Sequence, residues 1–447
     1  MAFPDRYDVI IVGAGAAGLA AATELARAGI SVAIVEARER IGGRIATLRD
    51  PALGYPVELG AEFIHGRPAE IWDPLMNAGA RVAEVKGDAW CSTDQLAPCD
   101  FFDSVHQVLG RMDDRAPDLS FADFLEECFP SAQDPDLREL KKYALGYVSG
   151  FNAADPKLVG VHWLVKGMRH EQEIEGDRAF RCEHGYQDLI DIFRARLTSA
   201  SLPIHLKTVV HAIDWRPGDV RISIQRGASE VLRAGKVIVT VPLAVLQARD
   251  SEEGAIRFNP HLPDEKYAAL DRMEMGKVIR LVLKFRERFW DSICPANVRE
   301  GGLSDMSFLF SDDEWFPTWW TTMPARQPLI TGWAPFACAE RLSGRERPFV
   351  VKQGLTTLSR LLRVNLPRLE QLFEAAYVHD WQSDPLSRGA YSYGKVGADG
   401  AQAALARPIQ NTLFFAGEAT DTSGSNGTVH GALKSGFRSA REILNHS

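Results

Sequence analysis

The sequence is poor in the residues that mark metal-binding and disulfide-rich proteins. It has six cysteines in 447 residues, and none of them forms a CxxC pair or shows the spacing of metal ligands. The six cysteines are Cys91, Cys99, Cys128, Cys182, Cys294 and Cys338. We therefore expect no metal site, and scattered, reduced thiols of the kind found in a cytoplasmic protein.

Long hydrophobic runs are missing as well. The stretch that comes nearest is VIIVGAGAAGLAAA at residues 9–22, which is too short to span a bilayer. Asp5, Arg6 and Asp8 precede it where a signal peptide would carry a cationic leader. We therefore expect neither a membrane partner nor a secretory signal.

An excess of positive charge is also absent. The chain has 51 Lys and Arg against 59 Asp and Glu, a net charge of −8. This balance disfavours nucleic acid as a partner and is weakly compatible with cationic ligands. A length of 447 residues exceeds what one hydrophobic core usually covers, so two domains are expected.

Buried strands and one helix predict an α/β fold. YDVIIV is a continuous apolar strand, and a glycine turn leads from it into a helix that ends at Gly29. ISVAIVEAR is a second buried strand, and residues 235–242 and 411–417 predict two more. Residues 68–180 and 260–380 have helical and mixed patterns. We predict a Rossmann-like nucleotide-binding domain assembled from residues 1–67, 181–259 and 381–447, with an α+β substrate domain inserted as residues 68–180 and 260–380.

The glycine turn has the pattern of a dinucleotide site. GAGAAG at residues 13–18 follows a strand and opens a helix, whose N-terminus would face a pyrophosphate. An acid ends the next strand about 20 residues later, where a carboxylate accepts ribose hydroxyls and favours FAD or NAD over NADP. A purely structural glycine turn is the alternative. The expected contacts are Gly13, Gly15, Ala16, Ala17, Gly18, Glu36 and Ala37.

A second group of small and basic residues follows at once. EARERIGGRI places Arg38, Gly42, Gly43 and Arg44 after the acid, which offers backbone N–H groups and a guanidinium to phosphate oxygens. In VELGAEFIHG, at residues 57–66, a flat ring could lie against small residues. Taken singly, these are ordinary turns and, for Arg44, a surface salt bridge. Their order along the chain makes the pattern specific.

At this point the chain resembles the flavin-containing amine oxidases, which include monoamine oxidases, polyamine oxidases and flavin-dependent histone lysine demethylases. The blocks that carry the resemblance are VGAGAAGL, EARERIGGR, ELGAEFIHG, LKTVVHAIDW, VTVPLAVL, MGKVIRLVLKF, WQSDPLSRGAYSY and FFAGEATD…GTVHGALKSG. They run from the first ten residues to the last twenty in the family's order. The resemblance implies that the Rossmann-like domain binds FAD.

The resemblance also implies positions for the cofactor. The last block would close over the flavin, with Glu418 on a ribityl or phosphate-proximal hydroxyl and a helix N-terminus at Thr428 and Val429 facing the pyrimidine end of the ring. Ala390 stands where monoamine oxidases carry the cysteine that bonds to the flavin, so non-covalent FAD is expected. The further cofactor positions implied are Gly60, Ala61, Glu62, Val210, Thr240, Trp381 and Gly417, and for Trp381 a simple core role is the alternative.

Four residues are implied in the chemistry. Lys277 would be buried and would reach flavin N5 through a water during reoxidation by O2. Tyr391 would form one wall of an amine cage, and Thr428 stands where a second tyrosine would close it. His65 would hydrogen-bond a substrate nitrogen or accept its proton, with a structural role as the alternative.

The expected reaction is that of an FAD-dependent amine oxidase. Hydride would pass from the amine α-carbon to flavin N5, the imine would hydrolyse to an aldehyde, and O2 would be reduced to H2O2. A polyamine or another amine without an α-carboxylate is expected, because Glu62 and Phe63 stand where amino-acid oxidases need an arginine. A strict monoamine oxidase is disfavoured by the half-open cage, and a chromatin demethylase by the lack of a long helical hairpin.

Several questions stay open from the sequence. The rival functions are a desaturase-like FAD enzyme, a non-catalytic flavoprotein scaffold and an NAD-dependent dehydrogenase. The acidic stretch HEQEIEGD at residues 170–177 could attract a polyamine, although a solvated charge run is favoured. The aromatic stretch at residues 312–320 fits either a pocket wall or ordinary packing. The sequence leaves a homodimer open.

Overall fold

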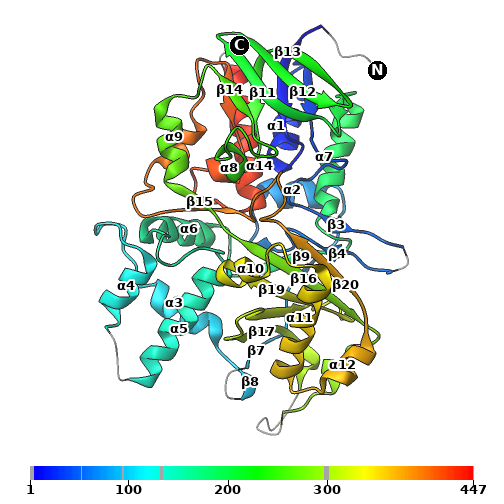
Figure 1. Cartoon of the computed structure of the whole chain (residues 1–447), viewed down its shortest axis with the longest axis vertical. Coiled ribbons are helices and arrows are strands. Elements are labelled where there is room, and N and C mark those ends of the chain that lie inside the picture. Colours follow the sequence, from blue (N-terminus) through cyan, green and yellow to red (C-terminus); the bar gives the residue numbers. More distant parts are fainter. Residues whose placement is uncertain (1–4, 52, 93–94, 131–133, 296–301, 446–447) are drawn as a thin grey trace.

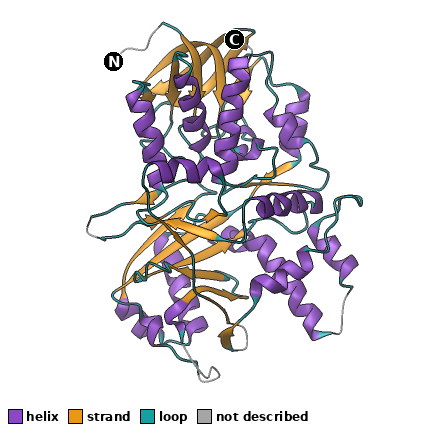
Figure 2. Cartoon of the chain, turned by 180° about the vertical axis from the view of Figure 1, so that it is seen from behind, coloured by secondary structure: helices purple, strands orange, loops and turns teal. Residues whose placement is uncertain are grey.

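The computed structural model describes residues 5–51, 53–92, 95–130, 134–295 and 302–445. Two large sheets lie at opposite ends of the molecule, and helices cover each of them (Figure 1). Seen from behind, the helices of the upper end stand side by side across one face of their sheet (Figure 2). The arrangement confirms the predicted mixture of α/β and α+β structure.

The first sheet has eight strands in the order β10-β2-β1-β13-β12-β11-β14, and β22 also pairs with β13. The pairings β1 with β2, β1 with β13 and β13 with β22 are parallel. The side chains of β1 alternate between two apolar clusters. Val9 and Ile11 belong to one cluster, and Ile10 and Val12 belong to the other. The strands are β1 (Tyr7–Val12), β2 (Val32–Val35), β10 (Ile204–His205), β11 (Val209–Arg216), β12 (Asp219–Arg226), β13 (Ala228–Val239), β14 (Arg257–Asn259) and β22 (Leu413–Phe415).

Four helices pack together at this sheet. Helix α1 (Ala16–Arg27) contacts α7 (Gln187–Ser199) and α14 (Val429–Asn445). Helix α2 (Ala69–Asn77) also contacts α7 and α14. Alanines in AAGLAAATELAR let α14 approach α1 closely, and a Cβ at Gly436 would lie 2.2 Å from the Ala17 carbonyl oxygen. Segments from both ends of the chain therefore build one layer.

The second sheet has seven strands in the order β20-β16-β19-β18-β17-β7-β8. Its apolar side packs against α10 (Phe336–Leu342), α11 (Arg347–Leu362) and α12 (Leu366–Leu372). The strands are β7 (Asp88–Ser92), β8 (Leu96–Pro98), β16 (Val278–Phe285), β17 (Met306–Ser311), β18 (Thr318–Thr321), β19 (Leu329–Pro335) and β20 (Phe373–Asp380).

A third group of helices lies beside the second sheet: α3 (Phe101–Leu109), α4 (Phe121–Cys128), α5 (Pro135–Gly150) and α6 (Val161–Glu173) (Figure 1). No helix among the described residues is long and apolar enough to cross a membrane. The smaller elements are β3 (Thr47–Leu48), β4 (Val57–Glu58), β5 (Ile64–His65), β6 (Val82–Glu84), β9 (Ala179–Cys182), α8 (Leu243–Leu246), α9 (Asp264–Asp271), β15 (Met273–Met275), β21 (Ser392–Gly394), α13 (Ala401–Ala406) and the 3-10 turns η1 (Phe289–Ser292), η2 (Leu303–Asp305) and η3 (Glu418–Thr420).

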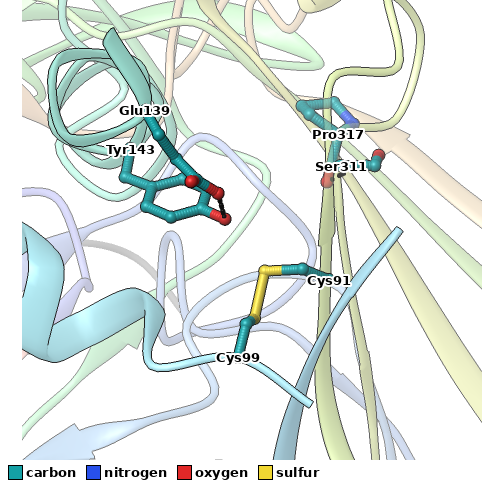
Figure 3. Close-up of a disulfide and its surroundings, with 6 residues drawn as sticks. All are labelled: Cys91, Cys99, Glu139, Tyr143, Ser311 and Pro317. Carbon is teal, nitrogen blue, oxygen red and sulfur yellow. Dashed lines mark hydrogen bonds between the residues drawn. A yellow bond between two sulfur atoms is a disulfide. The ribbon is translucent and has the colours of Figure 1, made fainter. Parts of the chain in front are cut away.

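The expectation of six reduced cysteines is wrong. Cys91 on β7 and Cys99, which directly follows β8, form a disulfide (Figure 3). The two strands form an antiparallel pair, in which Cys91 lies opposite Ala97, so the two thiols meet across a short hairpin. Cys128, Cys182, Cys294 and Cys338 are free. A separation of eight residues is no recognised motif, which is why the sequence did not reveal the bond.

We predict that protein purified without reductant and denatured will show four reactive thiols, and six after reduction. Replacing both Cys91 and Cys99 by alanine should lower the free energy of unfolding by about 2–3 kcal/mol, because the cross-link restricts the unfolded chain. Thiol titration and denaturant unfolding measure the two effects. Six reactive thiols before reduction would show that the bond does not form.

Candidate active site

One large cavity of about 1180 Å³ is lined by residues of both sheets and of the helices between them. Its volume exceeds the range of roughly 300–1,000 Å³ that is usual for a single small ligand. One part, which we call the glycine arm, is lined by Gly13, Gly15, Ala16, Ala17, Gly42, Gly43, Gly60, Ala61, Gly417 and Gly427. The other part, the aromatic arm, is lined by Phe63, Tyr147, Phe151, Phe308, Trp320 and Trp333.

The turn between β1 and α1 is built for close approach. Gly13 has a φ of +108°, which L side chains rarely adopt. A Cβ at Gly18 would lie 2.0 Å from the Gly13 carbonyl oxygen, so only glycine lets the helix pack on the turn. Gly15 caps α1 without a side-chain hydrogen bond, and the first-turn N–H groups of a helix have no intrahelical acceptor. These groups face the glycine arm, where an anionic pyrophosphate fits them.

The Glu36 carboxylate lies next to this turn. It accepts hydrogen bonds from the backbone N–H of Ala14 at 2.7 Å and of Arg38 at 2.8 Å, and it is buried. A carboxylate has about four acceptor positions, so further donors such as two ribose hydroxyls can still bind. The Arg38 guanidinium is held by Asp384 at 2.8 and 2.9 Å and by Ser387.

A partly buried ion pair lies in the cavity wall beside the glycine arm. Arg44 donates to Glu418 at 2.9 Å and to the Ala390 carbonyl oxygen at 2.7 Å. Glu418 also accepts from the Ser392 hydroxyl at 2.6 Å and from the Gly427 N–H at 3.0 Å. The predicted hydroxyl contact of Glu418 therefore stays a prediction, while its visible partners join three segments of the chain.

The cavity collects most of the residues predicted from the sequence, although their roles stay predictions. The cavity lining includes Gly13, Gly15, Ala16, Ala17, Glu36, Ala37, Arg38, Gly42, Gly43, Arg44, Gly60, Ala61, Glu62, His65, Val210, Thr240, Trp381, Tyr391, Gly417, Glu418, Thr428 and Val429. Two predicted residues are not in the lining. Gly18 lies behind the turn, in its packing role, and Lys277 lies elsewhere.

The predicted burial of Lys277 is wrong. Its side chain is 43% exposed, and its ammonium group pairs with Glu340 of α10 at 2.5 Å. Alternation along β16 explains the error: Ile279 packs in the apolar core, whereas Val278 and Arg280 line the cavity. Lys277 lies two residues before Ile279, so its side chain points to the same side as Ile279 and away from the cavity. The cation that β16 presents to the cavity is therefore Arg280.

Tyr391 and Thr428 both line the cavity, and both hydroxyls have partners. The Tyr391 hydroxyl donates to the Phe151 carbonyl oxygen at 2.5 Å, which holds the ring against the start of the aromatic arm. The Thr428 hydroxyl donates to the Ser425 carbonyl oxygen at 2.6 Å and accepts from the Gly431 N–H at 3.0 Å. It therefore caps α14, which the sequence analysis did not foresee.

His65 lies in the cavity wall against the ring of Phe151, with ring centroids 5.1 Å apart. Burial lowers the pKa of His65 to about 4. The imidazole is therefore neutral at pH 7 and too weak a base to hold a substrate proton. Of the two roles predicted for it, hydrogen bonding to a substrate nitrogen is the one this environment favours.

Glu171 on α6 is the acid that the sequence undervalued. It lines the cavity, and burial raises the pKa of its carboxyl to about 7. Among the described residues no ion-pair or hydrogen-bond partner contacts this carboxylate. Glu171 is partly buried, so the solvated description of residues 170–177 holds for it only in part, whereas Glu173 is 73% exposed in its side chain and fits that description.

Arg280 was also missed as a cavity residue. An arginine inside the apolar strand KVIRLVLKF was a signal, because a charged residue in a buried strand needs a partner or a ligand. For the aromatic stretch at residues 312–320, both a pocket wall and ordinary packing were left open, and each holds for one residue. Trp320 lines the cavity, and Trp319 is buried in the core. No group of three or more potential metal ligands occurs among the residues that the structure describes.

Comparison with known proteins points in one direction. A family model described as flavin containing amine oxidoreductase matches residues 16–91 and 93–444. Lysine-specific histone demethylase 1 homolog 3 of Arabidopsis thaliana is 29% identical over 514 residues, which cover 98% of this chain and 30% of the relative. Polyamine oxidase 2 of Arabidopsis thaliana is 27% identical over 466 residues, which cover 97% of this chain and 87% of the relative.

A solved structure of a putrescine oxidase triple mutant has the same fold. It superposes with a TM-score of 0.80 at 21% identity and covers 99% of each chain. Among the demethylase relatives, the chain spans between 30% and 58% of their own length. In contrast, the match covers 87% of the length of the polyamine oxidase and 99% of the putrescine oxidase chain.

We predict that Gly15→Ala will weaken FAD binding by about tenfold or more and leave the thermal unfolding of the cofactor-free protein unchanged. Gly15 has φ −76° and ψ −177°, which alanine adopts freely, and its Cβ would meet nothing closer than Gly43 at 4.0 Å. The methyl group would instead project from the turn that a pyrophosphate must approach. FAD titration and thermal unfolding separate the two effects. Unchanged FAD affinity would remove this turn from the cofactor site.

Proposed function

Because the chain belongs to the flavin-containing amine oxidoreductase family, we propose that it is an FAD-dependent oxidase of diamines or polyamines. One observation carries the proposal: the cavity joins a glycine arm suited to a dinucleotide with an aromatic arm that contains the unpaired carboxylate of Glu171. A substrate with two amino groups has a use for both features, since one nitrogen reacts while the other binds the acid.

The residues of the glycine arm fit non-covalent FAD. Glu36 would accept the ribose hydroxyls, the N-terminus of α1 the pyrophosphate, and Val210 the adenine. Ala390 lines the cavity and offers no nucleophile for a covalent bond. When bound, FAD would accept a hydride from the amine α-carbon and pass the electrons to O2, which gives H2O2 and an imine that water hydrolyses to an aldehyde.

The aromatic arm would receive the amine in a largely apolar setting. Aliphatic amines have a pKa of about 10, and burial without an acid partner lowers the pKa of an amine. The reacting nitrogen needs its lone pair, so it must enter as the neutral base. Tyr391 would form one wall beside this nitrogen, Trp381 would pack near the flavin ring, and His65, neutral at pH 7, can hydrogen-bond the nitrogen without adding positive charge.

Glu171 would bind the second nitrogen as an ammonium ion. Burial raises the pKa of this carboxyl to about 7, and no described residue donates a hydrogen bond to it or pairs with it to offset the lost hydration. An ammonium group would supply that compensation, and the binding of a cation would lower the pKa again. Tyr147 lies close enough for Glu171 to raise the pKa of its hydroxyl further, beyond the effect of burial, which keeps the phenol protonated and able to donate to the acid.

We predict that Glu171→Gln will raise KM for putrescine or spermidine by about tenfold or more and will change KM for a monoamine of similar length by less than about twofold. The reason is that only the diamine has a second cation for the carboxylate. Peroxide release gives both constants. The matched control is Glu173→Gln on the same helix, whose exposed acid pairs with His170. Equal effects on both substrate classes would refute the distal contact.

The pH dependence of KM gives a separate test. The Glu171 carboxyl is neutral below its pKa of about 7 and charged above it, while the distal amine stays protonated up to about pH 10. We predict that KM for the diamine falls as pH rises from about 6 to 8, beyond any change in the monoamine, and that Glu171→Gln abolishes this difference. Parallel profiles for the two substrates in the wild-type protein would contradict the assignment.

A further inference from the structure

The aromatic and glycine arms meet at a buried charged cluster that the proposed amine contacts do not use. Arg280 is central to β16, is 3% exposed and lines the cavity. Its neighbours in the sheet are Trp333 on β19 and His379 on β20. A guanidinium so deep in a sheet loses its hydration, and such a cost is tolerated where partners or a ligand offset it.

The partners of Arg280 account for only part of its hydrogen-bonding capacity. One terminal nitrogen donates to the Gly60 carbonyl oxygen at 2.9 Å, and the other pairs with Glu62. The Nε of Arg280 is buried, and no residue that the structure describes accepts a hydrogen bond from it. Each terminal nitrogen of Arg280 therefore already holds one fixed partner, and the guanidinium is oriented by these two contacts.

The cluster carries more positive than negative charge. Glu62 pairs with Arg280 and, through the Nε of Arg181, at 2.8 Å with a second guanidinium. Burial alone would raise the pKa of Glu62, but the two guanidinium groups outweigh it and hold the pKa below its usual value. Two cations and one anion leave a charge of +1. Burial raises the pKa of nearby Glu58 to about 7, so below neutral pH that acid does not cancel the excess.

This excess charge is directed at the glycine arm. Arg280 holds the backbone of Gly60, a residue that lines the arm beside Ala61 and Trp381, and Glu62 follows two residues later. A buried positive charge that its partners do not neutralise stabilises negative charge on whatever occupies the neighbouring space. A flavin gains electron density when it is reduced, so the charge acts on its reduction equilibrium.

We propose that Arg280 raises the reduction potential of the bound flavin, and that Glu62 is the counter-ion that limits this effect. The inference rests on the proposal that the glycine arm holds FAD, but it does not depend on the identity of the amine. Arg280 and Glu62 then set how readily the cofactor takes electrons, while the aromatic arm selects the donor.

The test compares FAD-loaded wild-type protein with three variants and needs no amine. Arg280→Met should weaken the sulfite adduct of the flavin by about tenfold or more and lower the two-electron midpoint potential, by about 30 mV for each tenfold change in the equilibrium. Arg280→Lys should retain most of both values. Glu62→Gln removes the anion and should therefore tighten the sulfite adduct and raise the midpoint potential. Arg286→Met, an exposed arginine directly after β16, is the control and should change neither.

Opposite shifts in Arg280→Met and Glu62→Gln support the proposal, because a merely structural cluster would disturb the site in the same direction in both. Shifts of the same sign, or no shift in either, overturn it. If Arg280→Met does not retain FAD, Glu62→Gln decides instead: a tighter sulfite adduct and a higher midpoint potential, with Arg280→Lys close to wild type, support the proposal, and a weaker adduct or no change in Glu62→Gln overturns it. Absence of amine oxidation with opposite shifts refutes only the proposed function, whereas failure of the wild-type protein to bind FAD refutes both.

Discussion

The partly buried ion pair between Arg44 and Glu418 is the interaction on which the cavity depends. Arg44 belongs to the N-terminal segment and Glu418 to the C-terminal one, and their further contacts reach Ala390 and Ser392, the first residue of β21. Removal of one partner would leave an uncompensated buried charge, which typically costs about 3–5 kcal/mol. The pair thus joins three segments that are distant in the sequence, and the glycine arm exists because they meet.

The cofactor side of the molecule was largely predictable because its requirements are local. A tight turn, a helix N-terminus and an acid at the end of the next strand lie within about 25 residues, and each leaves a mark in the sequence that backbone geometry explains. Gly13 and Glu36 accordingly line the cavity, whereas Gly18 packs behind the turn and does not line it. The predicted strands and helices of the first sheet formed for the same reason, since an apolar strand buried on both faces has a distinctive pattern.

The substrate side was less predictable because it depends on contacts between distant segments. Successive side chains along a strand point to opposite faces, so an odd difference in position separates two residues onto different faces. For this reason Lys277 faces Glu340 and Arg280 faces the cavity. Whether Glu171 is solvated or buried depends on what packs around α6, and the pairing of Cys91 with Cys99 depends on a hairpin. Of these outcomes, only the place of Arg280 left a local signal, as a charged residue within an apolar strand.

In the proposed complex, the positive charge of Arg280 lies beside the flavin, and the carboxylate of Glu171 binds the distal ammonium group in the same cavity. The most direct test of this claim is an anaerobic titration of the FAD-loaded protein with putrescine, spermidine, a monoamine and an amino acid, followed by the visible flavin band. The account predicts that the di- and polyamines bleach the band at lower concentration than the monoamine, and that the amino acid does not bleach it. A band that persists with every amine, although FAD is bound, would contradict the account.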